Sequence, residues 1–233
     1  MSEFAQLDKT FHIIMKRMVE TGQAPHYTEI AKELGVSMEE GRKALHDLFS
    51  SPEIAGWLYP NTDFIVSFAP FNNLPTQFRI TIDGEQKWFG QWAFESLAVC
   101  WLFPGKVVQI DTPCLDCGDP IQVQIKDGVL LKAEPQSLIS YVAVPLAEWY
   151  QDLGYAWATM TFFRSEAHLR NWAQFDSATE DGIIALNDLV KLFSGRDCSR
   201  RLDPDYVSHM SEYGADFMAI LQEIGKTGPF WSI

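Results

Sequence analysis

The chain has 233 residues and a formal net charge of −13, and its length suits one domain with an appendage or two small domains. Hydrophobic residues make up 47% of the sequence, which excludes global disorder, and the acidic balance disfavours nucleic acid and anionic membranes as partners. The N-terminus lacks a basic region followed by an apolar run, and the longest apolar stretch, residues 96–103, falls far short of the ~20 residues of a spanning helix. We therefore expect a cytoplasmic protein with no membrane partner.

The first segment, roughly residues 4–56, is predicted to be helical. The apolar residues of its first helix recur at helical spacing: Phe11, Ile14, Met15 and Met18. Gly22 ends this helix, and Thr28 is placed to cap the next one. Ser37 opens a third helix, with Glu40 three residues further on, which is a capping-box pattern.

This helix-turn-helix outline has two interpretations. One is DNA binding, with the helix of Arg42 and Lys43 in a groove. The other is a small three-helix bundle packed on the rest of the protein. Residues 1–60 hold six Lys and Arg against nine Asp and Glu. Because phosphate contacts dominate affinity for DNA, this balance favours the packed bundle.

The middle of the chain, roughly residues 57–163, is predicted to form strands around one helix. Five segments alternate or run apolar: residues 63–68, 78–82, 107–110, 121–125 and 160–163. Asp83 and Gly84 form a hairpin turn signal. Residues 91–103 form a helix that is apolar nearly all round and therefore buried. The last third is predicted to be helical over residues 168–175, 181–193 and 205–224, which gives an α+β fold.

Cys114 and Cys117 lie in a turn between two predicted strands. A Cys-x-x-Cys-Gly turn can point both sulfurs at one ion, because Gly118 tolerates a positive φ. No histidine is spaced to complete a zinc site, and only distant folding could add Cys100 or Cys198. The two thiols could instead bind a soft ion such as mercury or copper(I) on their own. The remaining alternative is a tight turn with two half-buried thiols.

Glu95 lies in the buried helix, where an ionised carboxylate is costly unless it is paired or faces a cavity. Burial favours the protonated form, which suits a proton donor. The alternative is an ion pair with Arg79, Arg164 or a lysine.

The other polar groups point to no site of their own. Arg196, Arg200 and Arg201 form a short basic cluster with acidic neighbours, which predicts a solvated loop. The sequence contains no glycine-rich phosphate loop and no His-Glu-x-x-His motif. The five histidines are predicted to be surface or helix-face residues: His12, His26, His46, His168 and His209.

Several stretches of the chain resemble the alkylmercury (organomercurial) lyase family. They are residues 91–97 continuing to Phe103-Pro104, the strand to Pro113-Cys114, residues 118–121, residues 159–165 and Trp172. The resemblance implies an N-terminal helix-turn-helix-like (winged-helix-like) domain over residues 1–58, packed as in that family. It implies a lyase-like mixed sheet with surrounding helices over residues 59–233.

The family splits carbon–mercury bonds by protonolysis, using two cysteines and an aspartate. By resemblance, Trp92 stands where the first cysteine would be, Glu95 replaces the aspartate, and Trp157 stands in place of the second cysteine. Cys114 matches a third, structural cysteine, and Cys117 resembles an added thiol of some lyase-like relatives. Because an indole cannot coordinate mercury as a thiolate does, only the proton-donor role maps, onto Glu95.

Three functions follow as hypotheses. The first is a binding protein whose pocket of Trp92, Glu95 and Trp157 holds a small or cationic ligand. The second is an active lyase-type enzyme in which Cys114 and Cys117 capture the metal and Glu95 donates the proton. The third is a soft-metal carrier, or a metal-responsive regulator, that binds a soft or zinc-like ion at the cysteine pair.

Overall fold

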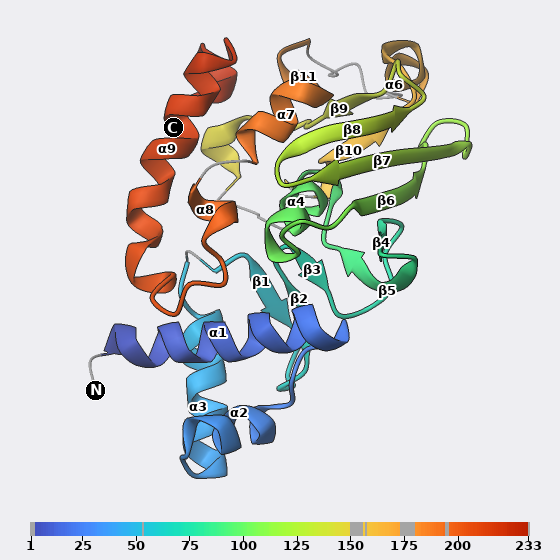
Figure 1. The fold of residues 1–233 in the computed structure, drawn as a ribbon. Coiled ribbons are helices and arrows are strands. Elements are labelled where there is room, and N and C mark those ends of the chain that lie inside the picture. Colours follow the sequence, from blue (N-terminus) through green and yellow to red (C-terminus); the bar gives the residue numbers. More distant parts are fainter. Residues whose placement is uncertain are drawn as a thin grey trace.

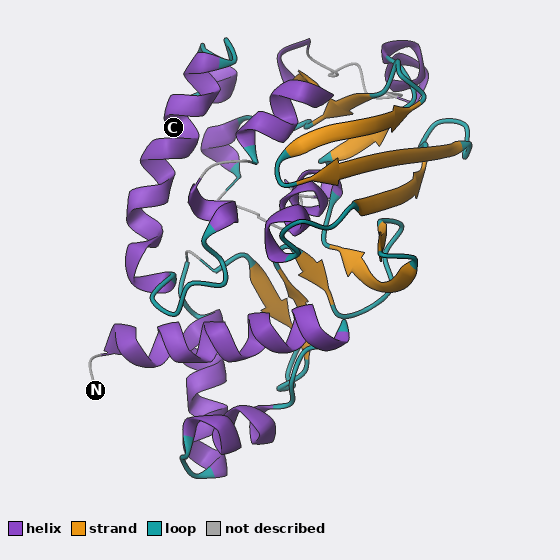
Figure 2. Ribbon diagram, in the orientation of Figure 1, coloured by secondary structure: helices purple, strands orange, loops and turns teal. Residues whose placement is uncertain are grey.

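A computed structural model of the chain describes residues 3–52, 54–149, 156, 158–172, 180–193 and 196–232. The fold is α+β, as predicted (Figures 1 and 2). Strands gather on one side of the molecule, while helices line the other side and the base. Within the described residues, no helix combines the length and the apolar character needed to cross a membrane.

Three helices form the N-terminal part: α1 (Glu3–Thr21), α2 (Tyr27–Leu34) and α3 (Met38–Phe49). The capping box of Ser37 and Glu40 is confirmed, since the Ser37 hydroxyl accepts from the Glu40 amide and the Glu40 carboxylate accepts from the Ser37 amide. The predicted cap of α2 is wrong, because His26 takes that position and Thr28 lies inside the helix. The Thr28 hydroxyl lies 2.9 Å from the His26 ring nitrogen and hydrogen-bonds it, so Thr28 supports the capping residue although it does not cap the helix itself.

The large sheet has the order β1-β2-β3-β5-β4-β6-β7-β8. Its strands are β1 (Gly56–Leu58), β2 (Ile65–Phe68), β3 (Phe71–Asn72), β4 (Arg79–Ile82), β5 (Glu85–Gly90), β6 (Val108–Pro113), β7 (Pro120–Lys126) and β8 (Val129–Glu134). The resemblance implied a mixed sheet, but all pairings in this sheet are antiparallel. Short turns join most consecutive strands, and such turns connect antiparallel neighbours. Asp83 and Gly84 both have positive φ in the predicted hairpin between β4 and β5.

The predicted buried helix exists but is shorter and changes its winding. It runs as α4 (Ala93–Ala98) and continues as the 3-10 helix η1 (Val99–Leu102). Trp92 is the N-cap residue of α4 with extended backbone, so it precedes the helix instead of lying in it. Ala93, Phe94 and Leu97 are almost completely buried, which confirms the expectation of an apolar helix inside the protein.

The second half holds a small antiparallel sheet and the remaining helices. The strands are β9 (Ile139–Tyr141), β10 (Thr161–Phe163) and β11 (Ile183–Ala185), in the order β10-β9-β11. The helices are α6 (Glu166–Trp172), α7 (Leu186–Leu192), α8 (Arg196–Ser199) and α9 (Met210–Glu223), with short 3-10 helices η2 (Leu146–Glu148), η3 (Glu180–Gly182), η4 (Val207–His209) and η5 (Pro229–Trp231). The predicted helix over 181–193 therefore begins only at Leu186, because residues 183–185 pair with β9.

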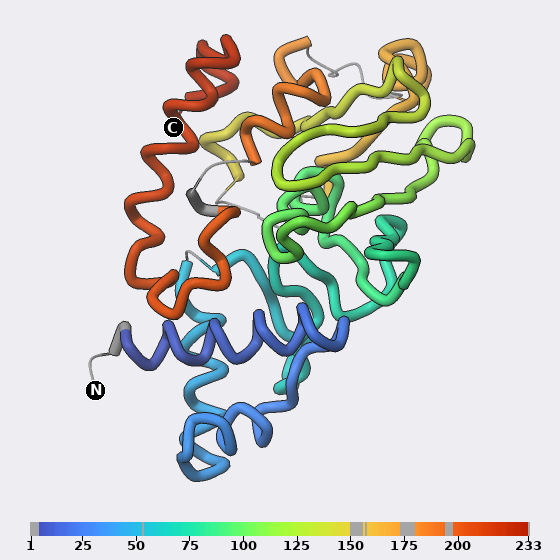
Figure 3. Tube along the Cα trace, viewed as in Figure 1, coloured from blue at the N-terminus to red at the C-terminus, as the bar shows by residue number. Residues whose placement is uncertain are grey.

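Helix α1 shares its core with the rest of the protein. The Trp88 ring nitrogen donates to the Met18 carbonyl at 3.0 Å, and the Phe11 ring packs on Phe68 at 4.9 Å between centroids. The Asp8 carboxylate accepts from the backbone amide of Ser208 at 3.0 Å. The last of these contacts places α1 beside the segment that leads into α9 (Figure 3). The division of the chain near residue 58 stays a prediction.

Helices α2 and α3 cross so closely that Gly41 has no room for a side chain. A Cβ built on Gly41 would lie 2.4 Å from the Ala31 Cβ. We predict that Gly41→Ala lowers the free energy of unfolding by roughly 1–3 kcal/mol, although alanine is the better helix former by about 1 kcal/mol. Gly214→Ala is the matched control, because a Cβ there meets nothing within 4 Å in α9, and it should leave stability equal or higher. Denaturant unfolding measures both, and equal destabilisation by the two substitutions would contradict this packing.

An ion-pair cluster joins α3 to the loop before β2. Hydrogen bonds from Arg42 and then His46 lower the pKa of Asp63 to about 2, from an ordinary value of 3.8. Because the folded-state pKa is the lower one, the cluster's contribution to stability is complete above pH 3.8 and is lost as the pH falls through about 2.

We therefore predict that Asp63→Asn costs about 1 kcal/mol or less at neutral pH, since the Arg42 side chain is 57% exposed. The difference from the parent protein should shrink as the pH falls from about 4 to about 2. Urea unfolding of both proteins across this range measures it. A difference that stays constant with pH would refute the linkage.

Candidate functional site

The turn between β6 and β7 holds both thiols of the Cys-x-x-Cys motif. The two strands pair in register from Val108–Ile125 to Pro113–Pro120, which fixes where the turn begins and ends. Within it, the Cys114 amide donates to the Asp119 carbonyl and the Gly118 amide donates to the Cys114 carbonyl, each at 2.8 Å. Gly118 has a φ of 75°, as the motif predicts. The turn thus brings the two sulfurs together.

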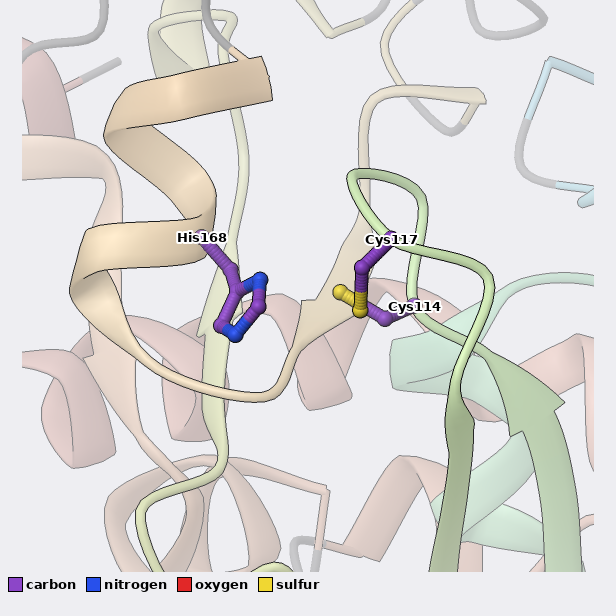
Figure 4. A group of neighbouring side chains, drawn as sticks. All are labelled: Cys114, Cys117 and His168. Carbon is purple, nitrogen blue, oxygen red and sulfur yellow. The ribbon is translucent and has the colours of Figure 1, made fainter.

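A third potential ligand comes from helix α6. One ring nitrogen of His168 and the sulfurs of Cys114 and Cys117 all lie within 4.8 Å of one another. Figure 4 shows the two sulfurs side by side and the imidazole facing them. We call Cys114, Cys117 and His168 the thiol–imidazole site. Sequence spacing gave no sign that a histidine would join the pair, and His168 does so because the fold packs α6 against the turn.

Asp116 holds the imidazole in place. Its carboxylate oxygen lies 2.8 Å from Nδ1 of His168, and the two side chains are 20% and 31% exposed. Carboxylates that hydrogen-bond a histidine in this way commonly orient it as a metal ligand. Asp116 lies between the two cysteines in sequence, so the same turn supplies both thiols and the group that orients the ring.

The two thiols differ in their surroundings. Cys114 is 2% exposed, whereas Cys117 is exposed. The Asp119 amide lowers the pKa of the Cys117 thiol, but desolvation and the neighbouring Cys114 thiol outweigh it, so the net pKa is raised. An incoming ion would meet Cys117 at the surface and displace its proton. Two sulfurs and one imidazole nitrogen form a ligand set for a soft or borderline ion and leave one tetrahedral position open.

Glu95 is paired with a residue that the sequence did not suggest. Nη1 of Arg201 donates to one carboxylate oxygen at 2.7 Å, and Nη2 donates to the other at 3.4 Å. The side chains of Arg201 and Glu95 are 5% and 14% exposed, so this ion pair is buried. The prediction of a solvated loop is therefore wrong for Arg201, although Arg200 is partly exposed and pairs with Asp203. Arg164, an expected partner of Glu95, donates instead to the Pro120 carbonyl.

The Glu95–Arg201 pair lies in the wall of a cavity of about 480 Å³, which we call the apolar cavity. Residues of α1, β2, α7 and α9 line it, most of them apolar or aromatic. Cys198 also lines it and is 4% exposed. The predicted pocket group is only partly described. Glu95 lines the cavity, Trp92 is half-buried and stacks on Trp57 at 5.4 Å, and Trp157 lies outside the described residues.

The thiol–imidazole site and the Glu95–Arg201 pair lie apart. The β6–β7 turn projects from one side of the molecule, whereas α8, which leads into Arg201, lies on the other side beside α9 (Figure 1). The structure therefore does not bring Cys114 and Cys117 to Glu95, as a shared catalytic site would require.

Comparisons with known proteins agree with this fold. The family model described as alkylmercury lyase (MerB) matches residues 71–194, slightly more than half of the chain. A crystal structure of the mercury-bound form of MerB2 is similar to the chain, with a TM-score of 0.64 and 20% sequence identity. The similarity covers 86% of this chain and 98% of the other. No curated protein matches the chain.

Removing Arg201 should reveal the free-energy cost of leaving the Glu95 carboxylate unpaired. Arg201→Met is predicted to destabilise the protein by roughly 3–5 kcal/mol, because it leaves a buried carboxylate without its partner. The double variant Glu95→Gln, Arg201→Met should recover much of that loss. A double-mutant cycle by denaturant unfolding measures the coupling. Stability of Arg201→Met within about 1 kcal/mol of the parent would contradict a buried pair.

Proposed function

This chain belongs to the alkylmercury lyase family, and from that premise we propose that it captures a thiophilic metal ion at the thiol–imidazole site. One observation carries the proposal. Cys114 and Cys117 meet His168, which follows about fifty residues later, within 4.8 Å. The proximity of these three side chains does not follow from their spacing in the sequence. Cysteine and histidine side chains commonly serve together as ligands of soft cations.

We propose that the ion is a soft metal cation, and we take Hg²⁺ as the example to be tested first. Thiolates bind soft ions in preference to the hard cations that carboxylates hold. The similarity to a mercury-bound form of MerB2 supports the choice of mercury as the first ion to test. The exposed sulfur of Cys117 gives an ion access from solvent, and the buried sulfur of Cys114 holds it against the sheet.

The proposal assigns no carbon–mercury protonolysis to the chain. Trp92 stands where the resemblance requires a cysteine, and its ring stacks on Trp57. Both carboxylate oxygens of Glu95 accept hydrogen bonds from Arg201, so the carboxylate is already engaged by a partner within the protein. A lyase that combined Glu95 with the cysteine pair would also need the two sites to be adjacent.

The regulator hypothesis finds less support. Of the two basic residues expected to contact DNA on α3, Arg42 pairs with Asp63, and Lys43 pairs with Asp47 at 2.5 Å. The first turn of α3, the end that a recognition helix presents to bases, carries Glu39 and Glu40. Phosphate binding would have to break internal ion pairs and approach acidic groups.

Metal binding by the reduced protein tests the proposal. With one equivalent of Hg²⁺ and a competing small thiol, native mass spectrometry should find one ion per chain. Cys114→Ser, Cys117→Ser should abolish it, and Asp116→Asn should weaken binding by about 10–100-fold, because the His168 ring loses its orienting partner. Cys198→Ser, which alters a buried thiol lining the apolar cavity, is the control and should bind normally.

Equal affinity in the double cysteine variant would overturn the proposal, and so would loss of binding in Cys198→Ser alone. Release of benzene from phenylmercury by the parent protein, above a control without protein, would contradict the assignment of capture without protonolysis.

A further inference from the structure

The thiol–imidazole site holds two thiols that can also react with each other. Cys114 and Cys117 are free cysteines, and their sulfurs lie side by side within 4.8 Å (Figure 4). The sulfur of Cys117 is on an exposed residue, whereas that of Cys114 is on a buried one. Neighbouring thiols of which one can be reached from solvent are the reactants of thiol–disulfide exchange, which is a second chemistry beside the binding of a cation.

The backbone of the β6–β7 turn sets the two cysteines at a separation that a disulfide can bridge. The Gly118 amide donates to the Cys114 carbonyl at 2.8 Å, which closes a single helical turn over residues 114–118. On such a turn the Cα atoms of residues three positions apart are about 5 Å from each other. Disulfides in proteins join Cα atoms about 4.4–6.8 Å apart. The bridge between Cys114 and Cys117 can therefore form mainly by rotation of the two side chains.

Hydrogen bonds at both ends hold the turn in this shape. The pairing of β6 with β7 continues as far as Pro113 and Pro120. The Cys114 amide donates to the Asp119 carbonyl at 2.8 Å, and Arg164, which follows β10, donates to the Pro120 carbonyl at 2.8 Å. Because none of these bonds uses a sulfur atom, they can all persist when the two sulfurs join.

We propose that Cys114 and Cys117 react with small-molecule disulfides and close reversibly into one intramolecular disulfide. The Cys117 thiolate attacks a sulfur of the small disulfide, which releases one small thiol and leaves a mixed disulfide on Cys117. The Cys114 sulfur then attacks the Cys117 sulfur and releases the second small thiol. The two protein thiols lose two electrons and two protons in total, and the two halves of the small disulfide gain them.

The disulfide switches ion capture off, and this consequence rests on the proposed function. A soft cation binds thiolates, and the bridged sulfurs of Cys114 and Cys117 are thiolates no longer. Only His168 then remains of the three ligands. Because exposed disulfides are the readily reduced ones, the bridge at Cys117 stays open to reductants. The chain therefore captures the ion under reducing conditions and loses this capacity when it is oxidised.

The other two cysteines serve as internal controls. Cys100 is 0% exposed, and burial raises the pKa of its thiol to about 11. Cys198 is 4% exposed. Because thiol–disulfide exchange needs an accessible thiolate, both should stay reduced. Cleavage after lysine and arginine tells the cysteines apart, since residues 107–126 form one peptide that holds both thiols of the site and neither control.

Oxidation of the full chain by oxidised glutathione tests the proposal. The reduced protein is brought to equilibrium with it at about pH 8, where part of an ordinary thiol is ionised, and the remaining thiols are alkylated before digestion and mass spectrometry. The peptide of residues 107–126 should lose two hydrogen atoms and take no alkyl group, and a phosphine reductant should restore both thiols. Two free thiols in this peptide, or glutathione left on Cys117 of the parent as the end product, would overturn the proposal.

Single variants test the order of the two steps. Cys114→Ser should stop at the mixed disulfide of Cys117 with glutathione, whereas Cys117→Ser should leave Cys114 as a free thiol. Cys117→Ser changes an exposed side chain, so it carries the test if the buried substitution Cys114→Ser prevents folding. Cys198→Ser is the matched control and should form the bridge as the parent does. Failure of the bridge in that control would place Cys198 in the reaction and refute the pair.

Ion binding by the two redox forms tests the switch. With one equivalent of Hg²⁺ and a competing chelator that contains no thiol, the oxidised protein should bind at least about tenfold less mercury than the reduced protein. Equal binding by both forms would refute the switch. The two proposals fail separately, because a bridged peptide without ion binding by the reduced protein overturns ion capture alone, and ion binding without a bridged peptide overturns the disulfide alone.

Discussion

The buried carboxylate of Glu95 has to be paired, and the rest of the site depends on the partner it takes. Leaving an ionised carboxylate unpaired inside a protein costs several kcal/mol. A segment that packs over Glu95 in α4 must therefore supply a partner for it. Arg201 meets this constraint from 106 positions along the chain. The segment that carries Arg201 then leads into α9, which closes the side of the apolar cavity. The ion pair thus ties the segment before α9 to the buried helix α4.

The same pair separates two chemistries that the family combines. By resemblance, a lyase needs thiolates beside its proton donor. In this chain an indole occupies one of those positions, and Arg201 engages the carboxylate. Two thiols persist, but they lie on the β6–β7 turn beside His168. The thiol pair and the carboxylate of Glu95 therefore lie in separate parts of the fold.

Local features of the fold were predictable from the sequence, and the partners of the site residues were not. The Ser37 capping box, the hairpin at Asp83 and Gly84, and the alternating strands on either side of Cys114 depend on neighbouring residues, so their patterns are visible. His168 and Arg201 act across 52 and 106 positions, and no spacing rule reaches that far.

Residues 183–185 illustrate a further limit. Their apolar run suits a helix or a strand equally well, and pairing with β9 decides between the two. Arg201 could have been suspected from one signal, because a glutamate in an apolar helix requires a cation somewhere. Three arginines in one basic cluster offered candidates, but the sequence alone could not distinguish the buried Arg201 from the partly exposed Arg200.

Anomalous diffraction from crystals of the reduced protein soaked in Hg²⁺ would show which of the four cysteines bind the ion. We expect the principal mercury peak between the sulfurs of Cys114 and Cys117, on the side that faces His168, with no comparable peak at Glu95. A principal peak at Cys198 in the wall of the apolar cavity would contradict it, because mercury would then bind beside the carboxylate and the two sites would be one.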